Sequence, residues 1–391
     1  MAQLGPVTAV VLSVSIIAIG AGLMTTRVSL DLEAHKEAVN SVRLVVTSYP
    51  AGFIIGCLTV RRLVEWCGHG RAFLLLIALL AALTLAFAST DDFRVWAVLR
   101  FGVGFSLSSI FTIVESWINL DSRSDNRGTL VSFYMIFSTL GTAAGPALVG
   151  LSITQGNAAP FIAALIFLIS ALPLLLSRRM RPAGSIQQER PQTDRPLALL
   201  ALLAAAPAAF AAALQTGMTN MPFSVMMPIY AVRVGYDPAQ AGALVSTFAL
   251  GGLAAQWPIG WLSDRLPRHK VLAAAAGTAG ITCCLIVLFG QVSAVVLFTL
   301  VFIFGCTALS IYPLALAYAG SAVQATFLVS LSSRLLLLHG MGSAIAPALS
   351  NELMARFGPP ALFFVLGAAT LSVGAIAIFG TPFKLAKEPS S

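Results

Sequence analysis

Long apolar stretches recur from one end of the chain to the other, and short polar connections separate them. Twelve of these stretches hold about seventeen residues or more, the length that a helix needs to cross roughly 30 Å of hydrocarbon. The pattern predicts an all-α polytopic membrane protein with twelve transmembrane helices. The stretches cover residues 6–28, 42–60, 72–88, 93–118, 130–153, 159–176, 197–221, 239–262, 271–290, 292–319, 324–349 and 361–379.

The composition also indicates a chain that lies in lipid. Of 391 residues, 58% are hydrophobic and 10% are charged, and the mean hydropathy is +0.90. This leaves too little polar surface to cover a water-soluble globule of this size. No Lys or Arg precedes the first apolar stretch, which is too long for the core of a signal peptide. We therefore expect a retained helix rather than a cleaved leader.

The net charge of +8 could suggest a nucleic-acid partner, but the placement of the basic residues indicates topology instead. With the N-terminus inside, most Lys and Arg fall on inner connections, as the positive-inside rule requires. We therefore expect no nucleic acid, both termini in the cytoplasm and a location in a bacterial inner membrane. The basic residues on outer connections are Lys36, Arg43, Arg94, Arg233 and Arg356.

Two short patterns each occur twice, about two hundred residues apart, which indicates two related halves. Residues 65–71 align with 264–270, and 141–146 align with 342–347. Between the halves lies the one extended hydrophilic connection, rich in Arg, Gln and Pro. We predict an N-terminal six-helix bundle over 1–178, a cytoplasmic linker over 179–196, and a C-terminal six-helix bundle with a short cytoplasmic tail over 197–391. Such duplication is typical of transporters that rock one half against the other.

Nothing in the sequence predicts an enzyme, a metal site or a cofactor. The four His and five Cys show no ligand spacing, and the odd number of Cys gives no disulfide framework. No nucleotide-binding loop is present, which argues against an ATP-driven pump.

Residues 260–270 resemble the G-x-L-x-D-R-x-G-R-[RK] signature that the major facilitator superfamily carries after its second helix and often repeats after its eighth. The first copy in this chain is worn, with Glu65 in place of the Asp. The resemblance implies that acids and bases of these loops hold an inward gate closed. A charge that only fixes topology is the alternative for both copies. The residues concerned are Glu65, Arg71, Asp264, Arg265 and Arg268.

Residues 96–104 resemble the fourth-helix motif of the same superfamily, in which an Arg is followed four residues later by Gly. Arg100 is expected about 10 Å into its helix, where a charge is costly without a partner or water. We expect it to face inward, with snorkelling to the interface as the alternative. Near the inner end, Glu115 and Arg127 match an acid and an Arg-Gly that form a gate salt bridge in the family. Glu115 could instead carry protons, but a carboxylate paired with a guanidinium stays ionised, which favours the gate.

Residues 141–150 resemble the fifth-helix G-x-x-x-G-P-x-x-G-G motif of antiporters, with Val149 in place of a glycine. Gly141, Gly145 and Pro146 are expected to let helix backbones approach closely, and this packing is also the simpler explanation of the motif. Residues 113–117, 126–128, 256–260 and 312–315 resemble the bacterial YcaD-like branch of the superfamily, over nearly all twelve spans.

Three arginines within spans favour an anionic substrate, because a desolvated charge needs an opposite one. They are Arg27, for which snorkelling is the alternative, Arg100 and Arg334. The prolines of the seventh span predict a broken helix whose Gln215, Asn220 and Tyr230 hydrogen-bond a substrate, with ordinary kinking as the alternative.

The sequence therefore favours a secondary active transporter of a small organic solute, anionic by preference, that works by alternating access. An efflux antiporter for lipophilic drugs and a non-transporting membrane sensor are the alternatives. We expect a monomer in the lipid bilayer, and coupling to H⁺ is left open.

Overall fold

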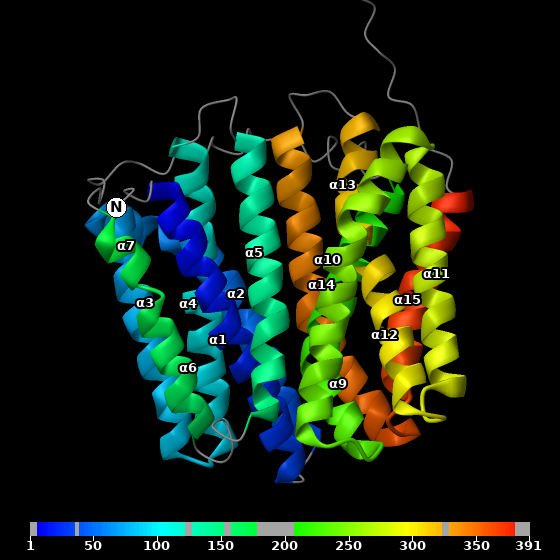
Figure 1. Cartoon of the computed structure of the whole chain (residues 1–391), viewed down its shortest axis with the longest axis horizontal. Helices are drawn as coiled ribbons and strands as arrows, with labels where there is room; N and C mark the ends of the chain where they lie inside the picture. The colour runs from blue at the N-terminus through cyan, green and yellow to red at the C-terminus, as the bar shows by residue number, and fades with distance from the viewer. Residues whose placement is uncertain are drawn as a thin grey trace, which may run out of the picture. The chain divides into compact units, whose positions relative to one another are not determined.

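A computed structural model describes residues 6–35, 39–121, 127–151, 158–177, 207–322 and 328–379, and over these residues the chain is helical without a strand (Figure 1). Its first helices are α1 (Pro6–Ala34), α2 (Val39–Cys67), α3 (His69–Ala86), η1 (Phe87–Ser89), α4 (Phe93–Asp121), α5 (Arg127–Ala147), η2 (Leu148–Gly150), α6 (Ala158–Ile169) and α7 (Leu172–Leu176). The later ones are α9 (Pro207–Arg233), α10 (Pro238–Arg265), α11 (Arg268–Phe289), α12 (Ala294–Ala308), α13 (Ile311–Ala322), α14 (Leu328–Phe357) and α15 (Ala361–Phe379).

Each of the twelve predicted spans contains a helix, so the predicted fold class is confirmed. Two predicted spans hold a pair of α-helices, α6 with α7 and α12 with α13. In both pairs the second helix has a proline in its first turn, Pro173 or Pro313, which removes a backbone hydrogen bond at the junction.

The prediction of a broken seventh span is wrong, because α9 runs without interruption through Pro222 and Pro228 to Arg233. A proline removes a single backbone hydrogen bond, and a membrane helix can re-satisfy the freed carbonyl locally and continue. The prolines of this helix therefore do not indicate where its backbone groups are exposed.

Eight segments of the described chain are long and apolar enough to cross a membrane. A shorter apolar helix covers Ile136–Gly150. The eight are Ala9–Ala34, Val39–Cys67, His69–Ser89, Phe93–Val114, Ala158–Leu176, Arg268–Phe289, Ala294–Ala319 and Ala361–Phe379.

The chain forms two compact units. Unit 1 comprises Met1–Gln187 with Ser224–Ala249, and unit 2 comprises Gln188–Phe223 with Leu250–Ser391. Each unit thus takes one part of α9 and one part of α10. The predicted linker, 179–196, lies outside the described residues, and the domain boundary predicted there stays a prediction.

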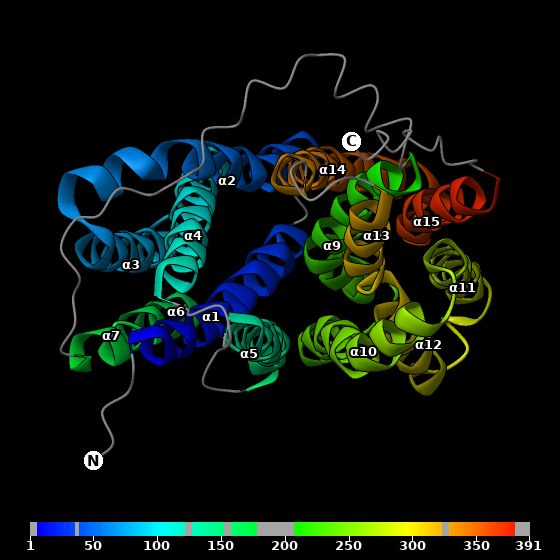
Figure 2. The ribbon, with the colours of Figure 1, turned by 90° about the horizontal axis from the view of Figure 1, so that it is seen from above.

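In unit 1, α2 packs along α4 and α1 along α5 (Figure 2). Glycines make the first of these contacts close. A Cβ atom added at Gly104 would clash with the backbone oxygen of Tyr49, and one added at Gly52 would clash with that of Phe101. The two backbones touch because neither residue has a side chain, which is how small residues join membrane helices.

We expect Gly104→Ala to lower the thermal stability of the purified protein by several degrees, because overpacking costs about 1–3 kcal/mol. Gly277→Ala is the matched control, since a Cβ at that position meets nothing within 4 Å and alanine is the better helix former. Melting curves in detergent check both variants. Equal melting temperatures for both variants would contradict the packing argument.

In unit 2, the apolar core is formed by residues of α9, α11, α13, α14 and α15, among them Phe210, Leu272, Ile311, Leu335 and Val373. Helix α11 packs along α15 and α12 (Figure 2). Helices α9 and α14 also approach closely, because a Cβ at Gly217 would meet the backbone oxygen of His339.

Candidate functional site

Arg100 is the most distinctive charged residue of unit 1, with 2% of its surface exposed. Its guanidinium carbon lies 4.8 Å from the centre of the Tyr49 ring on α2. Its Nη1 donates to the hydroxyl oxygen of Thr25 on α1 at 3.5 Å, the long limit of a hydrogen bond. The close packing at Gly52 and Gly104 brings α2 beside α4, so three helices meet at one guanidinium.

The charge of Arg100 is not neutralised by the residues around it. Its Nε is buried without a hydrogen-bond partner, and no ion pair joins Arg100 to a carboxylate in the described part of the chain. Burying an unpaired cation costs several kcal/mol, and contact with an aromatic face returns about 1–2 kcal/mol. The site therefore has an unmet requirement for negative charge.

The other predicted cationic side chains differ from Arg100. Arg27 pairs with Asp31 one turn along α1, with 2.7 Å between Nη2 and Oδ1. Its charge is thus already compensated. Arg334 lies in α14, but its side chain is outside the described residues. Among the three arginines, Arg100 alone has a described surrounding that favours an anion.

Of the polar residues predicted on α9, Gln215 has a described hydrogen bond, which stays within its own helix. Gln215 is buried and donates through Nε2 to the hydroxyl of Thr219 at 2.7 Å, while Thr216 donates to the Ala212 carbonyl. Asn220 is half-buried. Tyr230 lies ten residues further along α9 and is buried, with 1% of its surface exposed. Gln215 and Asn220 therefore lie within two turns of each other, and Tyr230 does not belong to the same cluster.

The side of α9 that carries Gly217 faces α14. Ser343 donates to the Gly217 carbonyl at 3.4 Å, and the His339 ring packs edge-on against Tyr312 of α13, with ring centres 5.7 Å apart. The Nδ1 of His339 is buried without a hydrogen-bond partner. His339 was not among the residues predicted to bind a substrate.

The two copies of the loop signature form local contacts. Glu65 pairs with Arg61 on the same helix at 2.7 Å. Asp264 lies 3.9 Å from Arg268, whose Nη1 donates to the Ala317 carbonyl at 2.6 Å, and Arg265 stacks on Trp261 at 3.9 Å. Arg71 is exposed. Arg268 of α11 thus contacts α13 through Ala317 and α10 through Asp264.

The proposed salt bridge between Glu115 and Arg127 falls on side chains outside the described residues. Both positions lie in helices, Glu115 in α4 and Arg127 at the start of α5. Their pairing stays a prediction.

The fifth-helix motif packs α5 against α1. A Cβ at Gly141 would clash with the Ser15 carbonyl, and one at Gly145 with the Ile19 carbonyl. Pro146 closes the contact from the other side, because its Cδ lies 2.8 Å from the Cβ position of Gly22. The described geometry therefore gives the motif a role in backbone packing.

One contact joins residues that the sequence analysis did not connect. Arg233, the last residue of α9, pairs with Glu33 near the end of α1. Its Nε lies 2.9 Å from both carboxylate oxygens and its Nη2 lies 2.8 Å from Oε2. The side chains are 28% and 19% exposed. This two-pronged geometry is the strong form of an ion pair.

Two further contacts lie near the same helix ends, also within unit 1. A Cβ at Gly242 of α10 would clash with the Pro146 carbonyl, and one at Gly150 would lie 2.8 Å from the Cβ of Ala239. The ends of α1 and α5 thus contact the end of α9 and the start of α10 through one ion pair and two glycine contacts.

Buried charge and closely packed, glycine-rich helices are typical of polytopic membrane proteins. The model of the Major Facilitator Superfamily matches residues 10–323 and 208–391. The chain belongs to this superfamily, whose members are transporters and not enzymes.

Two related transporters are similar in sequence to this chain over most of their length. An uncharacterized MFS-type transporter of Yersinia enterocolitica is 27% identical over 94% of this chain and 93% of its own length. The uncharacterized MFS-type transporter YcaD of Escherichia fergusonii is 27% identical over 93% of each. The resemblance to the YcaD-like branch is thus confirmed.

Solved structures share the fold at low identity. The nucleoside transporter NupG has a TM-score of 0.77 at 13% identity, covering 96% of this chain and 99% of that protein. A D-xylose-proton symporter has a TM-score of 0.72 at 14% identity, covering 97% and 99%. The protein is a multi-pass membrane transporter with the major facilitator fold.

Proposed function

We propose that this protein is a secondary active transporter that moves a small organic anion across a bacterial inner membrane by alternating access. The observation that carries this proposal is the buried guanidinium of Arg100, which has a free Nε and no described carboxylate partner. A substrate carboxylate, sulfonate or phosphate would supply the charge that the site lacks. A fork of guanidinium N–H donors suits these groups.

Alternating access requires contacts that form and break at one end of the helices. The Glu33–Arg233 pair, together with the close contact of Gly242 with Pro146, supports a closed arrangement of α1, α5, α9 and α10 at that end. Under the topology expected from the positive-inside rule, both termini are cytoplasmic and this end is the outer one. Glu65, Arg71, Glu115, Arg127, Asp264, Arg265 and Arg268 are proposed to serve at the inner end.

Within unit 2, residues of α9 and α14 are proposed separately as contacts for the substrate. Gln215, Asn220 and Arg334 are the candidates. Arg27 is a weaker candidate because it is paired with Asp31, and Tyr230 is weaker because it lies apart from Gln215 and Asn220 along α9. We propose a monomer, and coupling to H⁺ is an additional hypothesis. Efflux by exchange is the second candidate, supported by the resemblance of the Gly145-Pro146 motif to that of antiporters.

Reconstituted protein tests the proposal directly. We expect proteoliposomes to take up or exchange a member of a panel of radiolabelled organic anions with saturation, and to leave lipophilic cations and neutral sugars untransported. An imposed pH gradient, inside acid and inside alkaline in separate runs, shows whether H⁺ drives the flux. Transport of lipophilic cations alone would favour the drug antiporter, and no flux with any solute would favour the sensor.

A further inference from the structure

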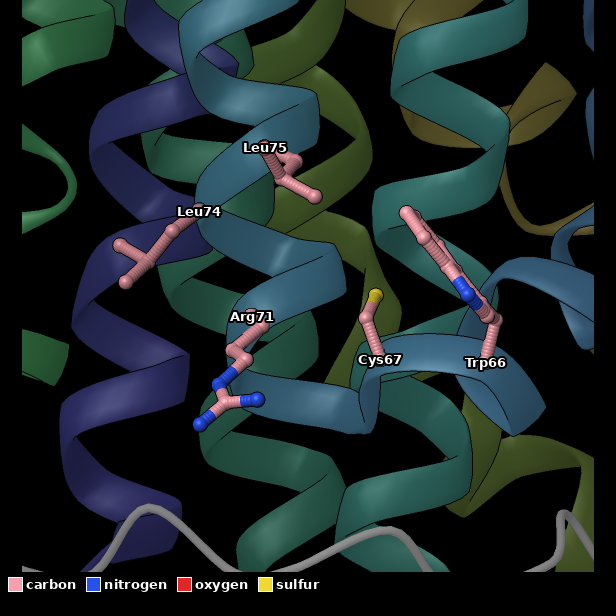
Figure 3. Close-up of a pocket in the computed structure, with 5 residues that line it drawn as sticks. All are labelled: Trp66, Cys67, Arg71, Leu74 and Leu75. Carbon is pink, nitrogen blue, oxygen red and sulfur yellow. The ribbon is translucent and has the colours of Figure 1, made fainter.

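A surface cavity of about 610 Å³ lies where α2 ends and α3 begins, away from Arg100. It is lined by Trp66, Cys67, Arg71, Leu74 and Leu75. Figure 3 shows the indole of Trp66 and the side chain of Arg71 on opposite sides of Cys67, with Leu75 further along α3. Trp66 is 80% exposed, which is unusual for so large an aromatic side chain.

The cavity has one cationic side chain with no described acidic partner. Arg71 is exposed and no ion pair is described for it, while the nearby carboxylate of Glu65 is held by Arg61 at 2.7 Å. Arg62, also exposed, adds a further positive charge to the same connection. The segment from Arg61 to Arg71 thus has three arginines and one glutamate, and it attracts anions.

The lining changes from polar to apolar along α3. Leu74 and Leu75 lie three and four residues beyond Arg71, which is about 5 Å deeper at 1.5 Å per residue. Both helices are apolar spans of membrane-crossing length, and Leu75 is 52% exposed. A tryptophan and an arginine beside a leucine surface match the boundary between headgroups and acyl chains, where indole rings collect.

We propose that this cavity binds an anionic phospholipid. The headgroup phosphate pairs with the Arg71 guanidinium, the Trp66 ring lies against the glycerol region, and an acyl chain covers Leu75. The positive connection belongs to the inner leaflet under the expected topology, where anionic lipids attract basic segments. The inference is independent of the transported substrate, and binding is measured without transport.

Native mass spectrometry of the delipidated protein titrated with phosphatidylglycerol or phosphatidylcholine tests the site. We expect phosphatidylglycerol to bind more tightly than phosphatidylcholine, and Arg71→Gln to weaken phosphatidylglycerol binding about fivefold, the usual effect of one arginine near an anionic surface. Arg62→Gln removes the same charge from the same connection outside the cavity and is the matched control. It should change binding by much less.

A second measurement locates the lipid. Phosphatidylglycerol with brominated acyl chains should quench part of the tryptophan fluorescence of the unmodified protein, and this part should be missing in Trp66→Phe. Equal binding of the two lipids to the unmodified protein would overturn the proposal, and this comparison needs no variant if Arg71→Gln fails to fold. Equal losses in Arg62→Gln and Arg71→Gln, or displacement by inorganic phosphate alone, would overturn it as well.

Discussion

Arg100→Gln is expected to abolish most saturable transport of the organic anion. Removing one partner of a desolvated charge pair costs about 2–5 kcal/mol, which corresponds to a loss of about thirtyfold or more in transport at low substrate concentration. Arg100→Lys keeps the charge without the planar fork, so it should retain part of the flux. Initial uptake rates in proteoliposomes at equal protein density measure both effects.

Arg94→Gln is the matched control for this prediction. Arg94 lies on the same helix, α4, and is exposed near its start. The same charge is lost there without disturbing the Tyr49 and Thr25 contacts, and flux should be unchanged. If Arg100→Gln folds with a normal melting temperature and transports the anion normally, the guanidinium is not the anion-binding group.

Tyr49→Phe separates a role for the aromatic face from a role for the hydroxyl. It keeps the face that lies 4.8 Å from the Arg100 guanidinium. We therefore expect transport close to that of the unmodified protein, while Tyr49→Leu should weaken transport by removing a contact worth about 1–2 kcal/mol.

The depth of Arg100 in the membrane could be predicted because it depends only on the residues of its own helix. Residue counting placed it about 10 Å into an apolar helix, and the cost of a charge at that depth required an inward direction. The sequence could not show that Arg100 has no described carboxylate partner. Asp31, Glu33 and Glu115 were all possible partners as long as the three-dimensional position of Arg100 was unknown. Only the coordinates assign Asp31 to Arg27 and Glu33 to Arg233.

The first apolar stretch explains why the ion pair between Glu33 and Arg233 was not predicted. The hydrophobic pattern ends near residue 28, but α1 continues to Ala34 and carries Asp31 and Glu33 with it. Helix propensity extends a helix beyond its apolar residues, so apolarity alone underestimates its length. Arg233 was interpreted as a charge that fixes topology, and a single sequence gives no signal that pairs it with a residue two hundred positions away.

For the twelve spans, too, some features could be predicted from the sequence and others could not. Length and apolarity were sufficient to locate the helices, because both are properties of one segment. Whether Pro222 and Pro228 break α9 depends on which neighbouring groups satisfy the freed carbonyls, and that is decided by the packed structure.

Glu33→Lys is expected to shift the conformational equilibrium away from the arrangement in which the ends of α1 and α9 are paired. The side chains are 19% and 28% exposed, so the pair is worth an amount between a surface and a buried ion pair, about 2 kcal/mol. Reversing one charge should therefore change the population ratio about thirtyfold, and the double exchange Glu33→Arg with Arg233→Glu should restore it. Distances between spin labels at His35 and Asp237 measure the populations, and flux measures the consequence.

The Glu352–Arg356 pair on α14 provides the control, since it lies within one helix with 2.6 Å between its charged atoms and ties no second helix to it. Reversing its charges should leave both the label distances and the flux unchanged. A stronger form of the experiment joins cysteines at positions 33 and 233 with a short crosslinker on a cysteine-free background. If the two ends must separate in each cycle, the crosslink stops transport and its cleavage restores transport; full flux through the crosslinked protein would show that this end does not open.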